Sequence, residues 1–529
     1  MTKNKDRLSI RLATLDDVDG IRNLVKRAYP DMTPYPHEML QAQINHFPEG
    51  VFVATLGKKI VGYAATLRIS EEKAVSQHNW KEITGNGYGT THEEKGDVLY
   101  GYEVCVDPEA RGIRIGQRLY NARKKLCQML RLKAIVFAGR IPRLKKQIKR
   151  FETVENYIDA VKNKKARDPV LSFQLRNGFS ILGVIKDYLN YDSESLGYGV
   201  HLIWRNPAFE QRTTSKRPRE RGPKILQQSE PSHGQFLSTV RVAAVQYRQR
   251  KIKSFEEFRQ LVEYFVDVVA DYKSDFALFP ELFTLQLLSI ENHPVPPEKA
   301  IKTIIKYTDQ LDAMFRELAV GYNVNIVAGS HPAIVDGKIQ NIAHIYLRDG
   351  STYKQPKIHP TPNEKYWWNI SGGDRVTVIP TDCGPIGVLV CYDSEFPELA
   401  RHLVNQGMKI LFVPFLTDER QSYCRVRYCA QARAVENQIY VVMSGSVGNL
   451  PNVHNMDIHY AQSCILTPCD FPFARDGIAA DTSPNVETVA IADLRIDNLI
   501  EARNEGTVQN LKDRRHDLYS VKWINKSND

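Results

Sequence analysis

The chain lacks the cysteine patterns that mark disulfide-rich and zinc-binding proteins. Its eight cysteines are scattered over 529 residues, none forms a C-x-x-C pair, and none stands near histidines at zinc-finger spacing. A disulfide framework and a structural metal are therefore not expected, and the thiols are predicted to be reduced.

Long apolar runs and a leader-like start are also missing. The longest runs, such as Ile386–Val390, are far too short to cross a bilayer. The segment from Met1 to Arg11 is polar and charged, so a secretory signal is not expected. The sequence therefore predicts a cytoplasmic protein with no membrane partner.

Residues 206–238 have few large apolar side chains and no apolar periodicity, and they are rich in proline and charge. This composition cannot bury a core, so the segment is predicted to be a basic linker. Because 529 residues exceed what one core usually holds, two domains are expected, at residues 1–205 and 239–524.

The net charge of +10 raises the question of an anionic partner. Much of the excess lies in Arg140–Lys165 and Arg205–Lys224. Nucleic-acid binding is one interpretation, and a solvated linker with a basic rim for an anionic ligand is the other. Because Phe209 is the only aromatic residue in the basic part of the linker, base stacking has little support there. A nucleic-acid partner is therefore not expected.

Strand and helix patterns alternate in both predicted domains. Before the linker we expect strands at Leu8–Leu12, Val51–Leu56, Lys59–Ile69 and Val98–Val106, with helices at Gly116–Leu132 and Pro169–Arg176. After it we expect strands at Val240–Gln246, Phe276–Phe279, Val376–Pro380, Pro385–Val390 and Lys409–Pro414, with a helix at Pro397–Gln406. These patterns predict two layered domains of α/β and α+β class.

Three segments of the second domain place reactive side chains after strands. One reads Phe-Pro-Glu and puts Glu281 at the carboxyl end of a strand, where open α/β sheets bind ligands. Another reads Lys-Ile-His and carries Lys357. In the last, Cys391 directly follows a buried apolar run, so its backbone is held while its thiol faces a pocket.

These residue types suit the cleavage of an amide. A carboxylate can take the proton of a thiol and later give it to the departing amine. An ammonium group and a backbone N–H can stabilise the oxyanion of the tetrahedral intermediate. The order Glu, Lys, Cys therefore points to nucleophilic hydrolysis of a carbon–nitrogen bond.

The second domain resembles the nitrilase, or carbon–nitrogen hydrolase, superfamily. The matching residues are Phe279-Pro280-Glu281, Lys357-Ile358-His359, Cys391-Tyr392-Asp393, Phe396-Pro397-Glu398 and Ala432-Arg433-Ala434-Val435-Glu436-Asn437. The resemblance implies an α-β-β-α sandwich that forms a homodimer or a higher homo-oligomer. It also implies that Glu281 is the general base, Cys391 the nucleophile, and Lys357 with the Tyr392 N–H the oxyanion site. Glu364 is the candidate for the second glutamate of this family, with an ordinary loop acid as the alternative.

The residues after the cysteine bear on the substrate. Nitrilases of this superfamily usually carry Trp-Glu there, whereas this chain has Tyr392-Asp393, which resembles the amidase branches. A small-molecule amide is therefore expected. Arg425 or Arg427 either binds a substrate carboxylate or belongs to a salt-bridged helix face.

The segment Val104–Gly116 joins a strand to a helix in the first domain. Its glycines would let backbone N–H groups approach an anion at the helix N-terminus. The segment resembles the acetyl-CoA motif of the GNAT acetyltransferases, and Arg-Asn-Gly-Phe179 resembles their later turn. The resemblance implies a mixed-sheet domain with acetyl-CoA as co-substrate. By this resemblance the pantetheine arm pairs with Val104 and Val106, and the pyrophosphate lies on Arg111, Gly112, Ile113, Arg114, Ile115 and Gly116.

Two positions depart from the GNAT pattern. Arg114 stands where the family keeps a glycine, and Gln174 stands where many members have a tyrosine that acts as general acid. Glu103 is a candidate base acting through water, or a satisfied strand carboxylate. Three hypotheses therefore follow. The chain is an amidase fused to an active N-acyltransferase, an amidase with a non-catalytic CoA-binding or scaffolding module, or a nucleic-acid- or partner-binding protein with a dead hydrolase fold. The intact Glu281, Lys357 and Cys391 argue against the third.

Overall fold

The computed structural model describes residues 8–30, 35–207, 209, 239–290, 296–451, 453, 456 and 458–524. These residues form two compact units, one before and one after residue 226. The predicted linker lies almost entirely outside the described residues, so its bounds stay a prediction. No helix within the described ranges is both long enough and apolar enough to cross a bilayer.

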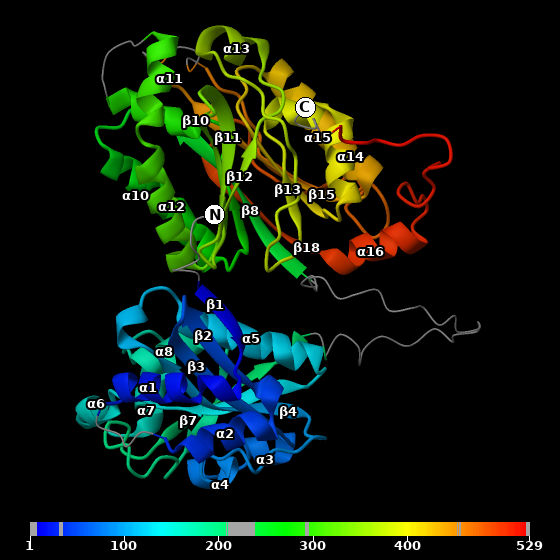
Figure 1. Ribbon diagram of the computed structural model, residues 1–529. Coiled ribbons are helices and arrows are strands. Elements are labelled where there is room, and N and C mark those ends of the chain that lie inside the picture. The colour runs from blue at the N-terminus through cyan, green and yellow to red at the C-terminus, as the bar shows by residue number, and fades with distance from the viewer. Residues whose placement is uncertain are drawn as a thin grey trace. The chain divides into compact units, whose positions relative to one another are not determined.

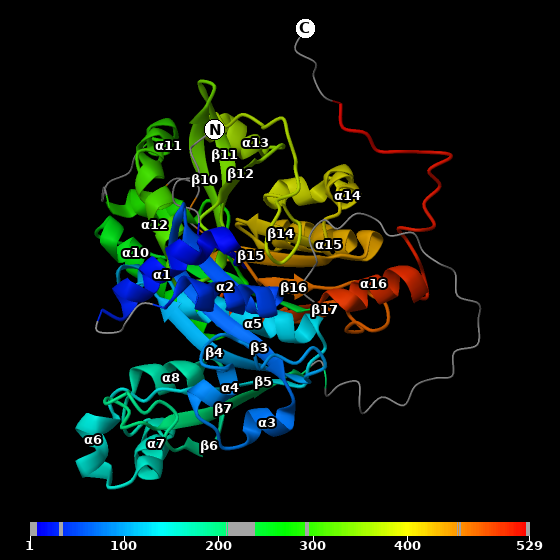
Figure 2. The same ribbon diagram turned by 60° about the horizontal axis from the view of Figure 1, so that its bottom comes forward.

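The first unit is a mixed sheet flanked by helices (Figure 2). Its strands are β1 (Leu8–Leu12), β2 (Val51–Leu56), β3 (Lys59–Ile69), β4 (Val98–Val106), β5 (Ala134–Gly139), β6 (Ser180–Ile185) and β7 (Gly199–Arg205). Its helices are α1 (Val18–Ala28), α2 (His37–His46), α3 (Glu71–Val75), α4 (Trp80–Thr84), α5 (Ile115–Met129), α6 (Leu144–Phe151), α7 (Val154–Lys162) and α8 (Pro169–Arg176). The strand order is β1-β2-β3-β4-β5-β7-β6.

One strand of this sheet separates from its neighbour part of the way along. β4 pairs with β5 in parallel only over Val98–Tyr100. Its later residues, Glu103–Val106, pair with β3 on the other side. On the β5 side, the end of β4 therefore has no strand partner among the described residues.

The second unit contains more strands than the first. They are β8 (Thr239–Gln249), β9 (Phe276–Leu278), β10 (Asn325–Val335), β11 (Lys338–Tyr346), β12 (Thr352–Pro356), β13 (Ile386–Val388), β14 (Ile410–Phe415), β15 (Tyr440–Gly448), β16 (Cys464–Leu466), β17 (Ile478–Asp481) and β18 (Thr488–Arg495). Its helices are α10 (Phe255–Asp271), α11 (Pro297–Ile305), α12 (Thr308–Tyr322), α13 (Pro362–Trp368), α14 (Pro397–Asn405), α15 (Arg420–Asn437) and α16 (Ile496–Glu505). Short 3-10 helices cover Phe283–Ile290 (η4) and Cys391–Glu395 (η5).

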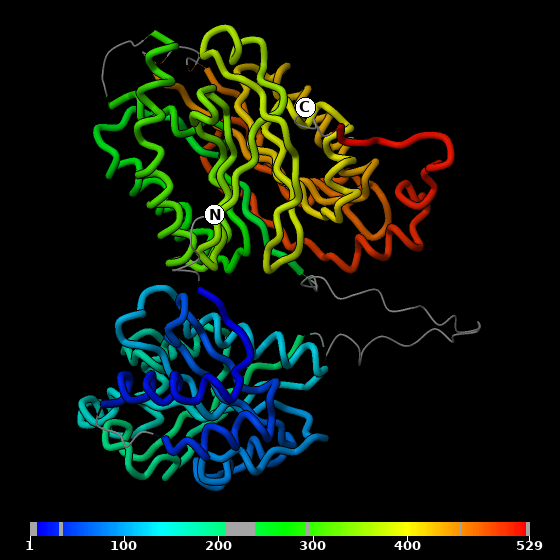
Figure 3. Tube along the Cα trace, viewed as in Figure 1, coloured from blue at the N-terminus to red at the C-terminus, as the bar shows by residue number. Residues whose placement is uncertain are grey.

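The strands of the second unit form two halves that face each other. One half runs β12-β11-β10-β9-β8 with β18 on β8, and the other runs β13-β14-β15 with β16 and β17. Three residue pairs between β8 and β15 join them. Apart from β18, which returns to β8 near the end of the chain, the strands of the first half precede those of the second, which Figure 3 shows as green and then yellow to orange. Helices α10 and α12 cover one side and α14 and α15 the other (Figure 1), which gives the α-β-β-α sandwich.

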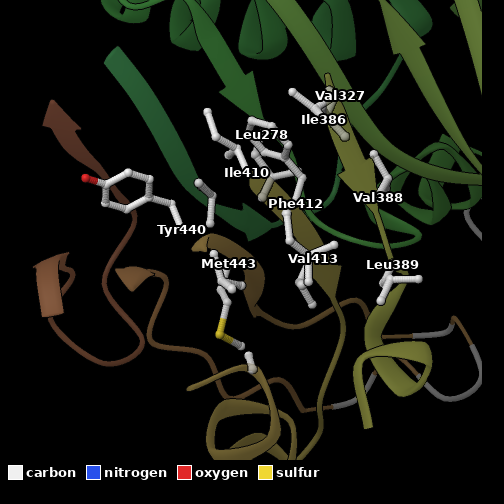
Figure 4. Close-up of a cluster of buried hydrophobic side chains, with 14 of the residues drawn as sticks. Leu278, Val327, Ile386, Val388, Leu389, Ile410, Phe412, Val413, Tyr440 and Met443 are labelled. Carbon is white, nitrogen blue, oxygen red and sulfur yellow. The ribbon is translucent and has the colours of Figure 1, made fainter. Parts of the chain in front are cut away.

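The space between the halves is filled with aliphatic and aromatic side chains. Leu278 and Val327 come from one half, and Ile386, Val388 and Phe412 come from the other (Figure 4). All five are almost fully buried. Full burial of each such side chain is worth roughly 1.5–3 kcal/mol, so this layer holds the strand ends in fixed positions.

The expected strand at Val376–Pro380 is wrong. Within that segment only Ile379 makes a β-bridge, with Ile386. Pro380 has no N–H to donate, which shortens any ladder there. The expected strand at Pro385–Val390 is also shorter than predicted, because β13 ends at Val388.

Candidate active site

Cys391 stands just beyond β13, as the first residue of η5. Its φ of 48° lies in the left-handed region, which residues other than glycine rarely adopt. The thiol is buried, donates to the Leu416 carbonyl oxygen at 3.9 Å and lies within hydrogen-bonding reach of Glu281. A strained backbone held by surrounding structure is typical of functional positions.

Glu281 follows β9 and is 2% exposed. One carboxylate oxygen, Oε1, accepts from Lys357 Nζ at 2.8 Å and from Asn341 Nδ2 at 3.0 Å. The other, Oε2, accepts the Leu416 N–H at 3.1 Å. Leu416 therefore contacts both the acid and the thiol through its backbone.

Lys357 lies between two carboxylates and is only 1% exposed. Its Nζ donates to Glu364 Oε2 at 2.6 Å as well as to Glu281. Burial alone would lower the pKa of Lys357, but the charges of Glu281 and Glu364 raise it well above its usual value. The lysine is therefore a cation at neutral pH.

The two glutamates have opposite pKa shifts. Burial raises the pKa of Glu281, and the neighbouring Glu364 adds to the increase, while Lys357 opposes it. For Glu364, burial also favours a higher pKa, but the charge and hydrogen bond of Lys357 outweigh it and the pKa falls. Glu281 is thus the better proton acceptor of the pair.

The thiol is protonated in the resting site. Burial raises the pKa of Cys391 well above its usual value, and the negative charge of Glu281 raises it further. Attack by sulfur therefore requires its proton to leave as the new bond forms.

Glu364 is fixed by the start of α13. Thr361 caps this helix, and the Glu364 side chain accepts the Thr361 N–H at 2.7 Å while the Thr361 hydroxyl accepts the Glu364 N–H. This reciprocal capping box orients the carboxylate toward Lys357. The structure thus brings together Glu281, Lys357, Glu364 and Cys391.

Asp393 has a role that the sequence did not reveal. Its carboxylate accepts the N–H groups of Ile358 and His359, at 2.9 and 2.8 Å, and contacts His359 Nδ1 at 2.9 Å. The His359 ring stacks on Phe396 with a centroid distance of 3.7 Å. Asp393 therefore ties the segment after Lys357 to the turn that carries Cys391.

The remaining predicted hydrolase residues lie in different surroundings. Tyr392 is in the first turn of η5, where N–H groups have no partner inside the helix. Arg425 is exposed and donates to Glu395 Oε1 at 3.1 Å, as in the salt-bridged alternative. Arg427 is part-buried and contacts Cys464.

In the first unit, the predicted CoA segment leaves open space beside Gly112 and leads into a helix without an acidic first turn. Gly112 has a φ of 98°, and a Cβ built there would meet no atom within 4 Å. Helix α5 begins directly after Arg114 and has no acidic residue in its first turn. Together with the open side of Val104 and Val106, these features fit a CoA thioester lying against β4 with its phosphates at the helix N-terminus.

Glu103 and Gln174 lie near this segment. Glu103 is part-buried and accepts the Tyr35 hydroxyl at 2.5 Å, while burial raises its pKa. Gln174 is buried, and a Cβ on Gly139 of β5 would lie 2.3 Å from its Oε1. Glu103 therefore lies in the part of β4 that does not pair with β5, and the Gln174 amide lies against the last residue of β5.

Comparison with known proteins agrees with both units. The carbon-nitrogen hydrolase family model matches residues 241–504, and the acetyltransferase (GNAT) family model matches residues 18–148. The probable hydrolase YhcX of Bacillus subtilis is 46% identical over 523 residues, which is 99% of this chain and 98% of that protein. The chain belongs to the carbon–nitrogen hydrolase family. This hydrolase carries a GNAT-family domain ahead of its catalytic unit, so both predicted resemblances are confirmed.

Two further relatives each match one unit. The uncharacterized N-acetyltransferase YkwB of Bacillus subtilis is 34% identical over 209 residues, covering 38% of this chain and 91% of the relative. The omega-amidase NIT2 of Xenopus tropicalis is 28% identical over 233 residues, covering 42% of this chain and 79% of the relative.

Proposed function

We propose that the second unit hydrolyses a linear small-molecule amide through a thioester on Cys391. The observation that carries this proposal is the buried Lys357 ammonium, held by Glu281 and Glu364 beside the Cys391 thiol. A cation and a carboxylate beside one thiol supply the proton acceptor and the oxyanion partner that amide cleavage needs.

The reaction follows from this arrangement. The proton of Cys391 passes to Glu281 as sulfur bonds to the amide carbon, and the negative oxygen is met by Lys357 Nζ and the Tyr392 N–H. Glu281 then gives that proton to the nitrogen, and the carbon–nitrogen bond breaks to leave a thioester. Water then attacks the thioester carbon as one of its protons passes to Glu281. The carbon–sulfur bond breaks, Glu281 returns the proton to the sulfur, and the carboxylic acid and the free thiol are restored.

Two observations narrow the expected substrate from carbon–nitrogen compounds in general to amides. Tyr392-Asp393 favours an amide over a nitrile, and the similarity to proteins named omega-amidases supports the same choice. Arg425 is already paired with Glu395 in a salt bridge. Arg427 is therefore the better candidate of the two arginines for binding a substrate carboxylate. We retain a homodimer or higher homo-oligomer through this unit, and a cytoplasmic location, as predictions.

Ammonia release from a panel of linear amides and nitriles tests this function. Replacing the nucleophile of a comparable acyl-enzyme hydrolase costs on the order of 10⁶-fold in rate, so Cys391→Ala is expected to abolish release. Cys127→Ala, which also removes a fully buried thiol but lies in α5 of the first unit, serves as the control and should retain activity. Continued release by Cys391→Ala, or a preference for nitriles, would contradict the proposal.

For the first unit we propose acetyl-CoA binding and N-acyl transfer to an amine. When bound, the thioester supplies an activated acetyl group. The backbone of Val104 and Val106 would hold the pantetheine arm, and residues 111–116 would hold the phosphates. Glu103 would take a proton from the acceptor through water. A CoA-binding or scaffolding module without transfer is the alternative, which the Arg114 and Gln174 departures favour.

A further inference from the structure

The proton acceptor and the oxyanion lysine of the hydrolase site depend on a residue outside the Glu–Lys–Cys pattern. Asn341 lies on β11 and is fully buried. Its Nδ2 donates to Glu281 Oε1 at 3.0 Å and to Glu364 Oε1 at 2.9 Å. One amide group therefore bridges the same two carboxylates that Lys357 bridges.

The backbone of Asn341 is also part of this arrangement. Its carbonyl oxygen accepts the Lys357 N–H at 2.8 Å. This bond continues the antiparallel ladder in which Ile342 pairs with Pro356. Asn341 thus fixes Lys357 through the main chain and both glutamates through the side chain.

The charges explain why an amide is needed at this position. Two carboxylates and one ammonium leave the buried site with an excess negative charge while the thiol is neutral. Hydrogen bonds donated to a carboxylate favour its ionised form, and Asn341 gives one to each glutamate. The reverse orientation of the amide would place its oxygen against two carboxylates, so these contacts determine which atom is Nδ2.

The oxygen of the Asn341 amide is in a less favourable position than its nitrogen. Within the described residues, Asn341 Oδ1 is buried without a hydrogen-bond partner. A buried acceptor left in this state is unfavourable. An apolar residue would avoid that cost but would leave each glutamate one donor short.

We propose that Asn341 is a positioning residue that keeps Glu281 ionised and aligned to accept the Cys391 proton. The inference rests on the proposed function of this site. It predicts that losing the amide makes Glu281 harder to ionise, so that higher pH is needed before the thiol can transfer its proton.

The rate of Cys391 alkylation by iodoacetamide tests this inference without knowledge of the substrate. Rates are measured on the full-length protein from pH 5 to pH 9 by peptide mass spectrometry, with the exposed Cys469 as internal reference. Asn341→Ala is expected to slow alkylation about tenfold at pH 7 and to move the pH midpoint upward by about one unit. Asn341→Asp preserves the shape of the side chain but adds a carboxylate beside Glu281 and Glu364. It should move the pH midpoint of alkylation upward at least as far as Asn341→Ala does.

Asn325→Ala is the matched control. Asn325 is equally buried and donates to Asp382 at 3.1 Å, but it stands at the opposite end of the strands, where β10 begins. The Asn325→Ala variant should have a lower melting temperature than the wild type but the same pH midpoint of Cys391 alkylation. Wild-type midpoints in both Asn341 variants would overturn the inference, even if both were less stable. Absence of amide hydrolysis by the wild type would instead refute the proposed function, because alkylation reports on the thiol alone.

Discussion

At the scale of single residues, the site separates two glutamates of one chemical type into two roles. Glu281 and Glu364 both contact Lys357, yet only Glu281 lies beside the thiol. Burial and the charge of Glu364 raise the pKa of Glu281, whereas Lys357 lowers that of Glu364. These opposite shifts suit the proposed roles, in which Glu281 accepts the proton and Glu364 holds Lys357 in place.

This difference predicts the pH dependence of hydrolysis. Glu281 must be ionised to act, so kcat/KM should fall as pH drops through its raised pKa, above the ordinary glutamate value. Glu364→Gln removes a negative neighbour that raises that pKa, so the acid limb should move to lower pH, by roughly one unit.

The Glu364→Gln variant should also turn over at least about tenfold more slowly, because Lys357 loses one of its two anionic partners. A pH–rate profile of ammonia release checks both effects. An acid limb that stays in place would mean that a group other than Glu281 controls it.

At the scale of elements, the site depends on how closely β10 approaches the end of β9. Gly329 of β10 has a φ of 59°, and a Cβ there would lie 1.8 Å from the Pro280 carbonyl oxygen. The next residue, Ser330, accepts the Leu282 N–H at 3.1 Å. The backbone on both sides of Glu281 is therefore set by this strand.

Gly329→Ala should displace Glu281 and remove most amide hydrolysis. The overlap with Pro280 and the positive φ should also lower stability by roughly 1–3 kcal/mol, which chemical denaturation measures. Gly321→Ala in α12 is the control, since a Cβ there meets nothing within 4 Å. That variant should be active and more stable by up to about 1 kcal/mol. Full activity in Gly329→Ala would contradict the proposed dependence.

At the scale of the whole molecule, two families share one chain, and each unit contains its own candidate site. The hydrolase residues come from strands and loops between Glu281 and Leu416. The candidate CoA segment runs from the end of β4 to the first residues of α5, within the first unit. Each function can therefore be removed without changing residues of the other.

Calorimetry of the full-length protein with acetyl-CoA tests this separation. Cys391→Ala should bind acetyl-CoA as the wild type does. Gly112→Ala should bind about tenfold more weakly, because a side chain disfavours a φ of 98°. Gly183→Ala, where a Cβ also meets nothing and the φ is ordinary, should bind normally.

Absence of binding by the wild type at acetyl-CoA concentrations on the order of 1 mM would reject both the transferase and the CoA-module hypotheses.

Much of the fold could be predicted because local pattern and structure agree. β1, β2, β3, β4 and α8 have the expected bounds. β2, β3, β4 and α8 also have glycine, proline or asparagine at an end or within two residues of it, which helps to set their bounds. The strand predicted at Val376–Pro380 is wrong because apolar composition alone does not provide a neighbouring strand to pair with.

The sequence by itself determined the two families, the α-β-β-α class and the types of reactive residue, because these follow from motifs along the chain. Only the tertiary structure decided that Asn341 bridges the glutamates and that Asp393 ties the lysine segment to the cysteine turn. Asn341 is 60 residues from Glu281 in the chain, and Asp393 is 35 from Ile358. A polar residue in a strand gives no local sign of its partner, so such contacts appear only when strands meet.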